Sequence, residues 1–182
     1  MQMQCEQQIE RVDDRVPAFI VTPGIRDFYA RTAAMVRSGQ LARFIDFDLM
    51  SMYRLAPDIM IIDVDPATCR KMSRFVGTRT VNVFGQESTG MYLDQIDIGP
   101  YRSQQLAAFN MAVAAKKPQW TCVKVQLAND RVTSQSASDG IAYERLIVPF
   151  MDEKQQASHL VAMMSCTATD IVDNAFEHRE ID

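Results

Sequence analysis

The sequence predicts an α+β domain built on a five-stranded antiparallel sheet, with helices on one face and a separate amphipathic helix before it. An apolar run at residues 59–64 and an alternating run at 69–76 flank a turn, which is typical of a β-hairpin. Helical segments follow in the middle of the chain. Three extended segments, at 119–127, 141–150 and 155–167, come last. Strands and helices grouped in this way indicate an α+β layout.

Length and composition fit one main domain with two terminal segments. The chain has 182 residues, of which 47 % are apolar, and this is enough for a core. We expect an N-terminal tail and amphipathic helix in residues 1–39, the main domain in 40–167 and an acidic C-terminal tail in 168–182. Apolar residues in the tail favour a short docking helix: Ile171, Val172, Ala175 and Phe176.

The N-terminal helix is predicted from its start signal and its apolar stripe. Thr22 can cap a helix, and Pro23 suits the first helical position. The residues that recur on one face are Ile25, Phe28, Tyr29, Thr32 and Val36. Such a face either covers the sheet or pairs with its copy in a second chain. The second alternative predicts a homodimer through the N-terminal helix, at residues 23–37.

Three glycines organise the middle of the chain. Gly77, Gly85 and Gly90 stand where the chain is expected to reverse, because glycine takes a positive φ without steric cost. A short apolar helix is predicted between the first two, and a longer helix at residues 100–117. Helices that pack small apolar side chains against a sheet in this way are expected to leave a pocket.

Charge and composition argue against several classes of protein. The net charge is −4, whereas a duplex-binding domain usually has a basic excess, so nucleic acid is not an expected partner. No apolar run approaches the roughly 18 residues of a membrane span. The first residues lack the features of a signal peptide. We therefore expect a cytoplasmic protein without membrane contact. Two histidines, and four cysteines without a C-x-x-C pair, predict neither a metal site nor a disulfide framework.

The glycine-containing stretch also carries a specific spacing. Phe75-Val76-Gly77-Thr78 leads to Phe84-Gly85, and Thr89-Gly90 leads to Leu93. Together with the order of hairpin, helices and three strands, this spacing resembles the core of the PAS superfamily. A bacterial PAS-like family of stand-alone sensor and regulatory domains is a closer resemblance. Its motifs occur here in order over roughly residues 40–167: Asp46-Phe47-Asp48, Val76 to Gly85, and Tyr143 to Pro149.

The resemblance implies a sensory or protein-interaction module, usually dimeric and without chemistry of its own. It implies a small organic ligand or a signalling protein partner. Haem-binding members use a histidine in the helical middle, and residues 77–118 contain none. Flavin photosensors carry an Asn-Cys-Arg-Phe motif, which the sequence lacks. No cofactor is therefore expected.

Seven residues are candidates for the pocket. The aromatic candidates either line it or simply fill the core: Phe75, Phe84, Tyr92 and Phe109. Arg79 either holds a carboxylate or phosphate of a ligand or lies on the surface. Tyr143 and Arg145 share a strand face and either orient a ligand or pack on the sheet.

Two other functions stay open at this point. A small enzyme would use the same cavity with Arg145, Tyr143 and Asp63 as its only plausible polar set, but no arrangement of nucleophile, base and orienting group is visible. A nucleic-acid interface would use the local basic segment at residues 70–79, although a solvated strand face is the simpler interpretation. The non-enzymatic sensory module is the function that the sequence favours.

Overall fold

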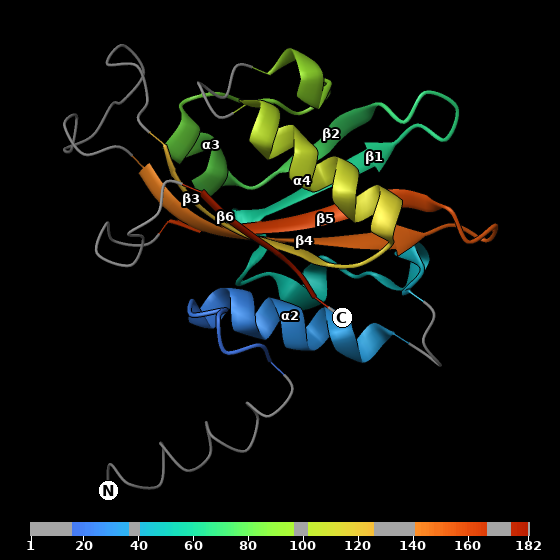
Figure 1. Cartoon of the computed structure of the whole chain (residues 1–182), viewed down its shortest axis with the longest axis horizontal. Helices are drawn as coiled ribbons and strands as arrows, with labels where there is room; N and C mark the ends of the chain where they lie inside the picture. The colour runs from blue at the N-terminus through green and yellow to red at the C-terminus, as the bar shows by residue number, and fades with distance from the viewer. Residues whose placement is uncertain (1–15, 37–40, 97–101, 126–140, 167–175, 182) are drawn as a thin grey trace, which may run out of the picture.

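An antiparallel sheet divides the molecule into two layers of helices (Figure 1). Helix α2 (Pro23–Met35) lies on one face, whereas α3 (Thr78–Phe84) and α4 (Arg102–Ala115) lie on the other. Short 3-10 helices connect α2 to the sheet and follow α3: η2 (Phe44–Asp46), η3 (Met50–Met52), η4 (Ala56–Asp58) and η5 (Leu93–Gln95). This computed structural model describes residues 16–36, 41–96, 102–125, 141–166 and 176–181.

The sheet has the strand order β2-β1-β5-β4-β3-β6, and every neighbouring pair is antiparallel. The predicted hairpin and the three later strands are therefore confirmed, and β5 closes the sheet by pairing with β1. The strands are β1 (Ile59–Val64), β2 (Lys71–Val76), β3 (Gln119–Val125), β4 (Ile141–Met151), β5 (Ala157–Cys166) and β6 (Phe176–Glu180).

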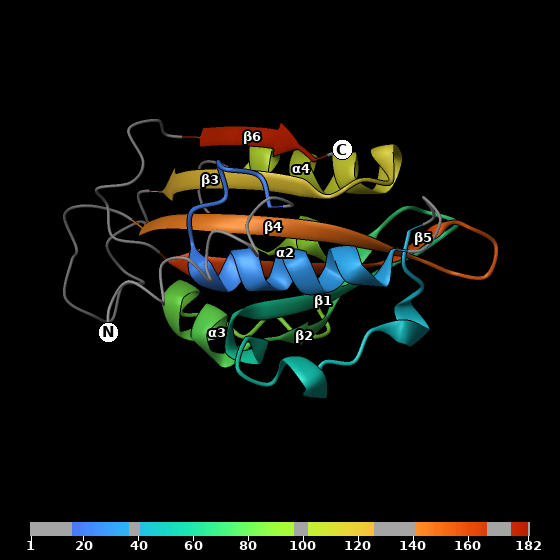
Figure 2. The ribbon, with the colours of Figure 1, turned by 90° about the horizontal axis from the view of Figure 1, so that it is seen from below.

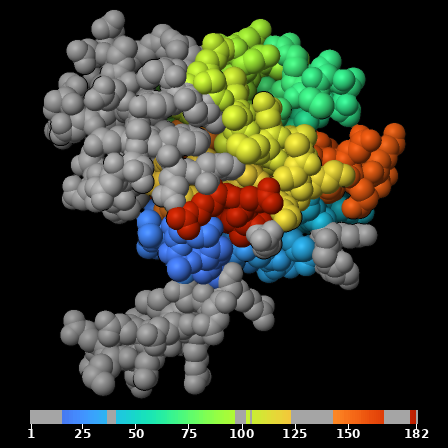
Figure 3. All heavy atoms as spheres, viewed as in Figure 1, coloured from blue at the N-terminus to red at the C-terminus, as the bar shows by residue number. Residues whose placement is uncertain are grey.

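Strand β6 corrects the prediction of five strands, because the sheet has a sixth. Phe176, the last residue of the expected C-terminal docking helix, is the first residue of β6, while residues 171–175 lie outside the described ranges. The strand pairs with β3, which has no other neighbour on that side. Backbone hydrogen bonding to an open sheet edge, more than any side-chain pattern, explains this strand. Figure 3 shows β6 at the surface, between the α4–β3 region and the segment that leads into α2.

Helix α2 covers the sheet within its own chain, which is one of the two roles predicted for its apolar stripe. It packs on β4 and β5 and crosses in front of them in Figure 2. Ile25, Phe28 and Thr32 from the stripe are buried there, whereas Tyr29 is half-buried and Val36 is exposed. Burial of these side chains gives α2 its stability, because a helix of 13 residues is marginal alone.

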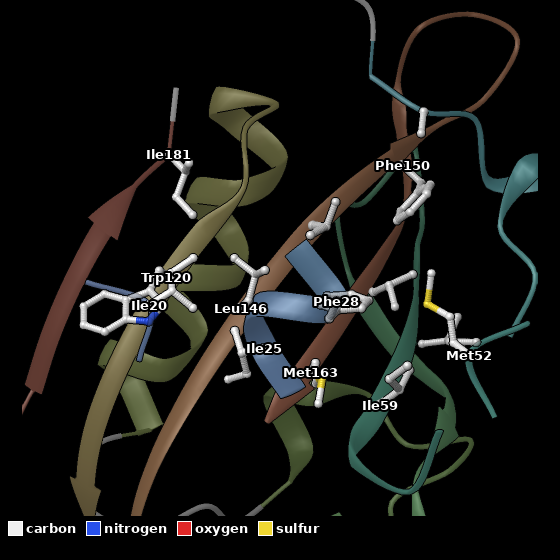
Figure 4. Packing of buried hydrophobic residues seen from close by; sticks show 14 of the residues in the cluster. Ile20, Ile25, Phe28, Met52, Ile59, Trp120, Leu146, Phe150, Met163 and Ile181 are labelled. Atoms are coloured by element: carbon white, nitrogen blue, oxygen red, sulfur yellow. The ribbon is translucent and has the colours of Figure 1, made fainter. Parts of the chain in front are cut away.

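Alternation along β4 builds one core on each face of the sheet. Leu146 and Phe150 point toward α2 and pack with Ile25, Phe28 and Met163 (Figure 4). Tyr143 and Ile147 point toward α3 and α4 and join a second cluster with Phe109, Leu160 and other residues. The strand is thus buried on both faces, and its polar side chains are enclosed as well.

Candidate functional site

A small cavity lies between the sheet and the helices α3 and α4, where the sequence predicts a pocket. Its volume is about 60 Å³. Apolar side chains form most of its wall, among them Met60, Val76, Leu93, Ile96 and Leu106. The polar side chains that reach it are Thr80, Gln86, Ser88, Gln105 and Arg145. The described part of the wall is therefore mostly apolar, with one positive charge.

Three of the seven candidate residues line this cavity, and a fourth lies beside it. Phe84 comes from α3, Phe109 from α4 and Arg145 from β4. Tyr143 is fully buried next to them, and its ring meets the ring of Phe84 edge-on with centroids 5.8 Å apart. Residues far apart in the sequence thus converge because α3 and α4 pack on the same face of β4.

The structure places the other three candidates away from the cavity. Phe75 packs against the core on the α2 side, because its neighbour Val76 occupies the cavity side of β2. Arg79 forms an ion pair with Asp58, and its side chain is 61 % exposed. Tyr92 lies under the guanidinium of Arg70, whose Cζ is 3.6 Å from the ring centroid.

Arg145 is the unusual residue of the cavity, because it is 2 % exposed and has no carboxylate beside it among the described residues. Its Nε donates to Thr121 Oγ1 at 3.2 Å, and its Cζ lies 4.6 Å from the centroid of the Phe109 ring. Its Nη2 has no hydrogen-bond partner in the described part of the chain. Burial lowers the pKa of this guanidinium from its ordinary value.

Two further polar groups in this region also lack partners within the described ranges, namely Gln105 Nε2 and the Tyr143 hydroxyl. Gln105 is 3 % exposed and lines the cavity. Burial raises the pKa of Tyr143 to about 12, so its hydroxyl keeps its proton at neutral pH. Sequence reasoning missed Gln105, although its position four residues before Phe109 on α4 places both on one helix face.

The order and pairing of the elements around this cavity identify the fold. A hairpin, two helices and a three-strand meander follow one another, and the last strand of the meander pairs with the first strand of the hairpin. This is the arrangement that the motif resemblance implied. The fold is PAS-like.

Several solved structures are similar to the chain at low sequence identity. A light-oxygen-voltage domain studied with a flavin analogue has 12 % identity and a TM-score of 0.45, over 69 % of this chain and 89 % of that one. A sensory box histidine kinase from Vibrio cholerae has 7 % identity and a TM-score of 0.44, over 66 % and 90 %. A Rhodobacter sphaeroides LOV protein has 10 % identity and a TM-score of 0.46, over 68 % and 70 %.

Sequence comparisons add nothing to the fold likeness: no protein-family model matches the chain, and no curated protein matches it. Among the described residues, no helix is long and apolar enough to cross a membrane. The same part of the chain contains no group of three or more His, Cys, Asp or Glu residues that could hold a metal ion.

The polar set proposed for an enzyme does not come together in the PAS-like fold. Asp63 lies on the α2 side of the sheet, where it pairs with Arg74 at 2.8 Å and lies 3.4 Å from His159 Nε2. His159 also stacks on Phe44, and burial lowers its pKa. Arg145 and Tyr143 are on the opposite face, so the cavity has no carboxylate base in the described residues.

The basic segment at residues 70–79 is largely neutralised by neighbouring groups. Arg70 pairs with Asp94 at 2.9 Å, Arg74 pairs with Asp63, and Arg79 pairs with Asp58. Lys71 is buried, and its Nζ donates to Asn110 Oδ1 at 2.6 Å. Such pairing leaves little free positive charge for phosphate groups. The nucleic-acid interface gains no support from this geometry.

Glu144, which belongs to the motif from Tyr143 to Pro149, lies on the α2 side of β4. It is 1 % exposed. Its carboxylate accepts hydrogen bonds from the backbone N–H of Val21 at 3.1 Å, from that of Thr22 at 2.9 Å and from Trp120 Nε1 at 2.7 Å. One buried carboxylate thus attaches the start of α2 to the sheet.

Proposed function

We propose that this chain is a non-enzymatic PAS-like sensory module that holds a small organic ligand in the cavity between the sheet, α3 and α4. The observation that carries the proposal is the apolar cavity with the buried guanidinium of Arg145 in its wall. Mostly apolar cavities with a few polar groups are the usual form of small-molecule sites. The separation of Asp63 from this cavity supports a binding role over catalysis.

The size of the cavity limits what it holds. Sites for drug-sized ligands are typically about 300–1,000 Å³, whereas this cavity is about 60 Å³. A molecule of a few heavy atoms fits without a change in the packing of α4. A larger ligand has to displace α4, which packs on β3, β4 and β5. Displacement of α4 by such a ligand would change how this helix sits on the sheet, and this would give occupancy a route to the surface.

A signalling protein partner and a homodimer belong to the same proposal. The apolar stripe of α2 faces the sheet, so a dimer through this helix has to use its outer face. Val21 before the helix and Val36 after it are 48 % and 40 % exposed, and they supply apolar contact at its two ends.

Native mass spectrometry of the full chain tests the ligand. The expected result is an additional small mass that is lost on denaturation. Leu106→Trp, which adds volume to the cavity wall, is expected to abolish that mass or added-ligand binding. Met111→Trp on the same helix is the control, because its side chain is 39 % exposed and outside the cavity lining. Loss of binding in both variants, or binding that survives Leu106→Trp, would contradict a ligand in this cavity.

A further inference from the structure

We propose that the ligand of this cavity is a small carboxylate, whose oxygens accept hydrogen bonds from the guanidinium of Arg145 and the side-chain amide of Gln105. This inference rests on the proposed function and names the chemical class of its ligand. It follows from the charge of the site, from the atoms left without partners, and from its size.

The charge of the site calls for an anion. Arg145 is 2 % exposed, and among the residues that the structure describes, none of the side chains that line the cavity is acidic. The adjacent acid, Glu144, is on the other face of β4, where it binds Trp120 and the backbone before α2. Taking an ion out of water without a partner is strongly unfavourable. The ring of Phe109 and the hydroxyl of Thr121 offset part of this cost, but neither carries a negative charge.

The atoms left without partners are hydrogen-bond donors. Arg145 Nη2 and Gln105 Nε2 are N–H donors, and neither has an acceptor among the described residues. The Tyr143 hydroxyl is equally unpartnered there, but its side chain lies beside the cavity and outside the lining. An ionised carboxylate only accepts hydrogen bonds and offers two oxygens to several donors. A guanidinium is also the side chain that best matches a planar carboxylate.

Size and charge together favour a carboxylate over phosphate. The cavity of about 60 Å³ is several times the roughly 10–15 Å³ needed to hold one water molecule. It therefore accommodates a molecule of about four to six heavy atoms by this measure. Apolar walls from Phe84, Leu93 and Ile96 suit a short carbon chain. Phosphate as a dianion would leave a second negative charge unpaired against these walls, whereas a monocarboxylate matches the single cation.

Binding measurements on the full chain with matched probes test the proposal. Acetate, propionate and pyruvate are compared with the neutral acetamide and propionamide at constant ionic strength, by calorimetry and thermal unfolding. We expect saturable binding of at least one carboxylate and at least tenfold weaker binding of its amide. Arg145→Met is expected to weaken carboxylate binding at least tenfold. Arg79→Met is the matched control, because that arginine is exposed and paired with Asp58, and it should leave the affinity unchanged.

A second variant keeps the test decisive if Arg145→Met does not fold. Gln105→Leu removes one donor and keeps the guanidinium, and it is expected to weaken carboxylate binding several-fold without affecting amide binding. Equal binding of carboxylates and amides, or of chloride and carboxylates, would overturn the carboxylate assignment and leave the sensory function standing. Absence of any bound or added small molecule in the cavity would overturn both.

Discussion

At the scale of single residues, Tyr143 makes the stability of the protein dependent on alkaline pH. Burial raises its pKa from the ordinary value of 10.0 to about 12. The folded protein therefore retains a proton that the unfolded chain loses above pH 10. The free energy of unfolding falls between about pH 10 and 12, by about 3 kcal/mol in total for this group. Denaturant unfolding at several pH values measures this loss.

Tyr143→Phe is expected to remove most of that alkaline loss. At pH 7 the substitution costs little, because the hydroxyl that it deletes has no partner among the described residues. Some pH dependence stays, since burial also raises the pKa of Tyr29. Tyr53→Phe serves as the control, because its side chain is 62 % exposed. An unchanged alkaline profile in Tyr143→Phe would show that the hydroxyl is accessible to water.

Glu144 is the residue whose loss should most affect the attachment of α2. Glu144→Gln keeps the shape of the side chain but replaces one accepting oxygen with an N–H₂ donor, which then faces other donors. We expect a loss of about 2–4 kcal/mol in the free energy of unfolding, typical of breaking a buried charged hydrogen-bond group. The fluorescence of Trp120, the only tryptophan, reports the change directly. Glu153→Gln in the exposed β4–β5 turn should change neither quantity.

At the scale of elements, the start of α3 depends on the absence of a side chain at Gly77. A Cβ there would lie 2.3 Å from the carbonyl oxygen of Pro57 and 2.4 Å from that of Ala56. Because both atoms belong to the backbone of η4, neither can move without displacing that turn. Gly77→Ala is therefore expected to destabilise the protein by about 2–4 kcal/mol, measured by urea unfolding.

The other end of α3 provides the comparison. Gly85 has φ 64°, a left-handed conformation that Asn tolerates at a helix C-terminus. Gly85→Asn should therefore cost less than Gly77→Ala. If Gly85→Asn cost more than Gly77→Ala, the backbone conformation at Gly85 would set the stronger requirement for glycine, and the close approach of η4 to Gly77 the weaker one.

The elements also show where sequence reasoning succeeds and where it stops. The sequence predicts that Tyr143, Arg145 and Ile147 share one face of their strand, because successive side chains of a strand point to opposite faces. The same alternation puts Phe75 and Val76 on opposite faces, but the sequence does not say which of them faces the cavity. A register shift between Ile61 and Ile62, opposite this part of β2, adds to the ambiguity. Strand β6 lay beyond prediction because it depends on an edge formed by distant residues.

Partners of charged residues are likewise a property of the tertiary structure. Arg79 lay next to the predicted pocket in sequence, yet its exposed side chain pairs with the buried carboxylate of Asp58 from η4. Arg145 has the same side-chain chemistry, but its strand places it in the core, where no described acid is beside it. Whether an arginine forms an ion pair within the chain or is left as an anion site therefore depends on the burial of its side chain. The sequence around the two arginines does not reveal that burial.

At the scale of the whole molecule, the helices on the two faces of the sheet have different structural roles. Helix α2 seals the core under one face and is attached through Glu144, while α3 and α4 enclose the cavity on the other face. Strand β4 contributes to both sides, since Glu144 and Arg145 are adjacent in it. A shift of β4 on ligand binding would therefore act on the attachment of α2 as well. Under the proposed sensory function, this connection would make the outer face of α2 the surface that reports occupancy.

A homodimer through that surface is the prediction that follows for the assembled protein. Helix α2 has 13 residues and is about 20 Å long, so it provides only part of the roughly 800 Å² per partner of a stable interface. Val21 and Val36 have to contribute at its ends. Its outer face carries the exposed ion pair of Asp27 and Arg31, with Ala34 beyond it. In a two-fold interface, such a pair can meet its copy with opposite charges facing each other.

Light scattering after size exclusion measures the dimer directly. The full chain is expected to have twice the monomer mass, and Ala34→Glu is expected to yield the monomer by adding a negative charge to the outer face of α2. Ala114→Glu, on the exposed side of α4, should leave the mass unchanged. Substitution is preferable to truncation here, because removal of α2 would expose Leu146 and Met163 and promote association by itself. A monomeric full chain, or a dimer that persists in Ala34→Glu, would exclude α2 as the interface.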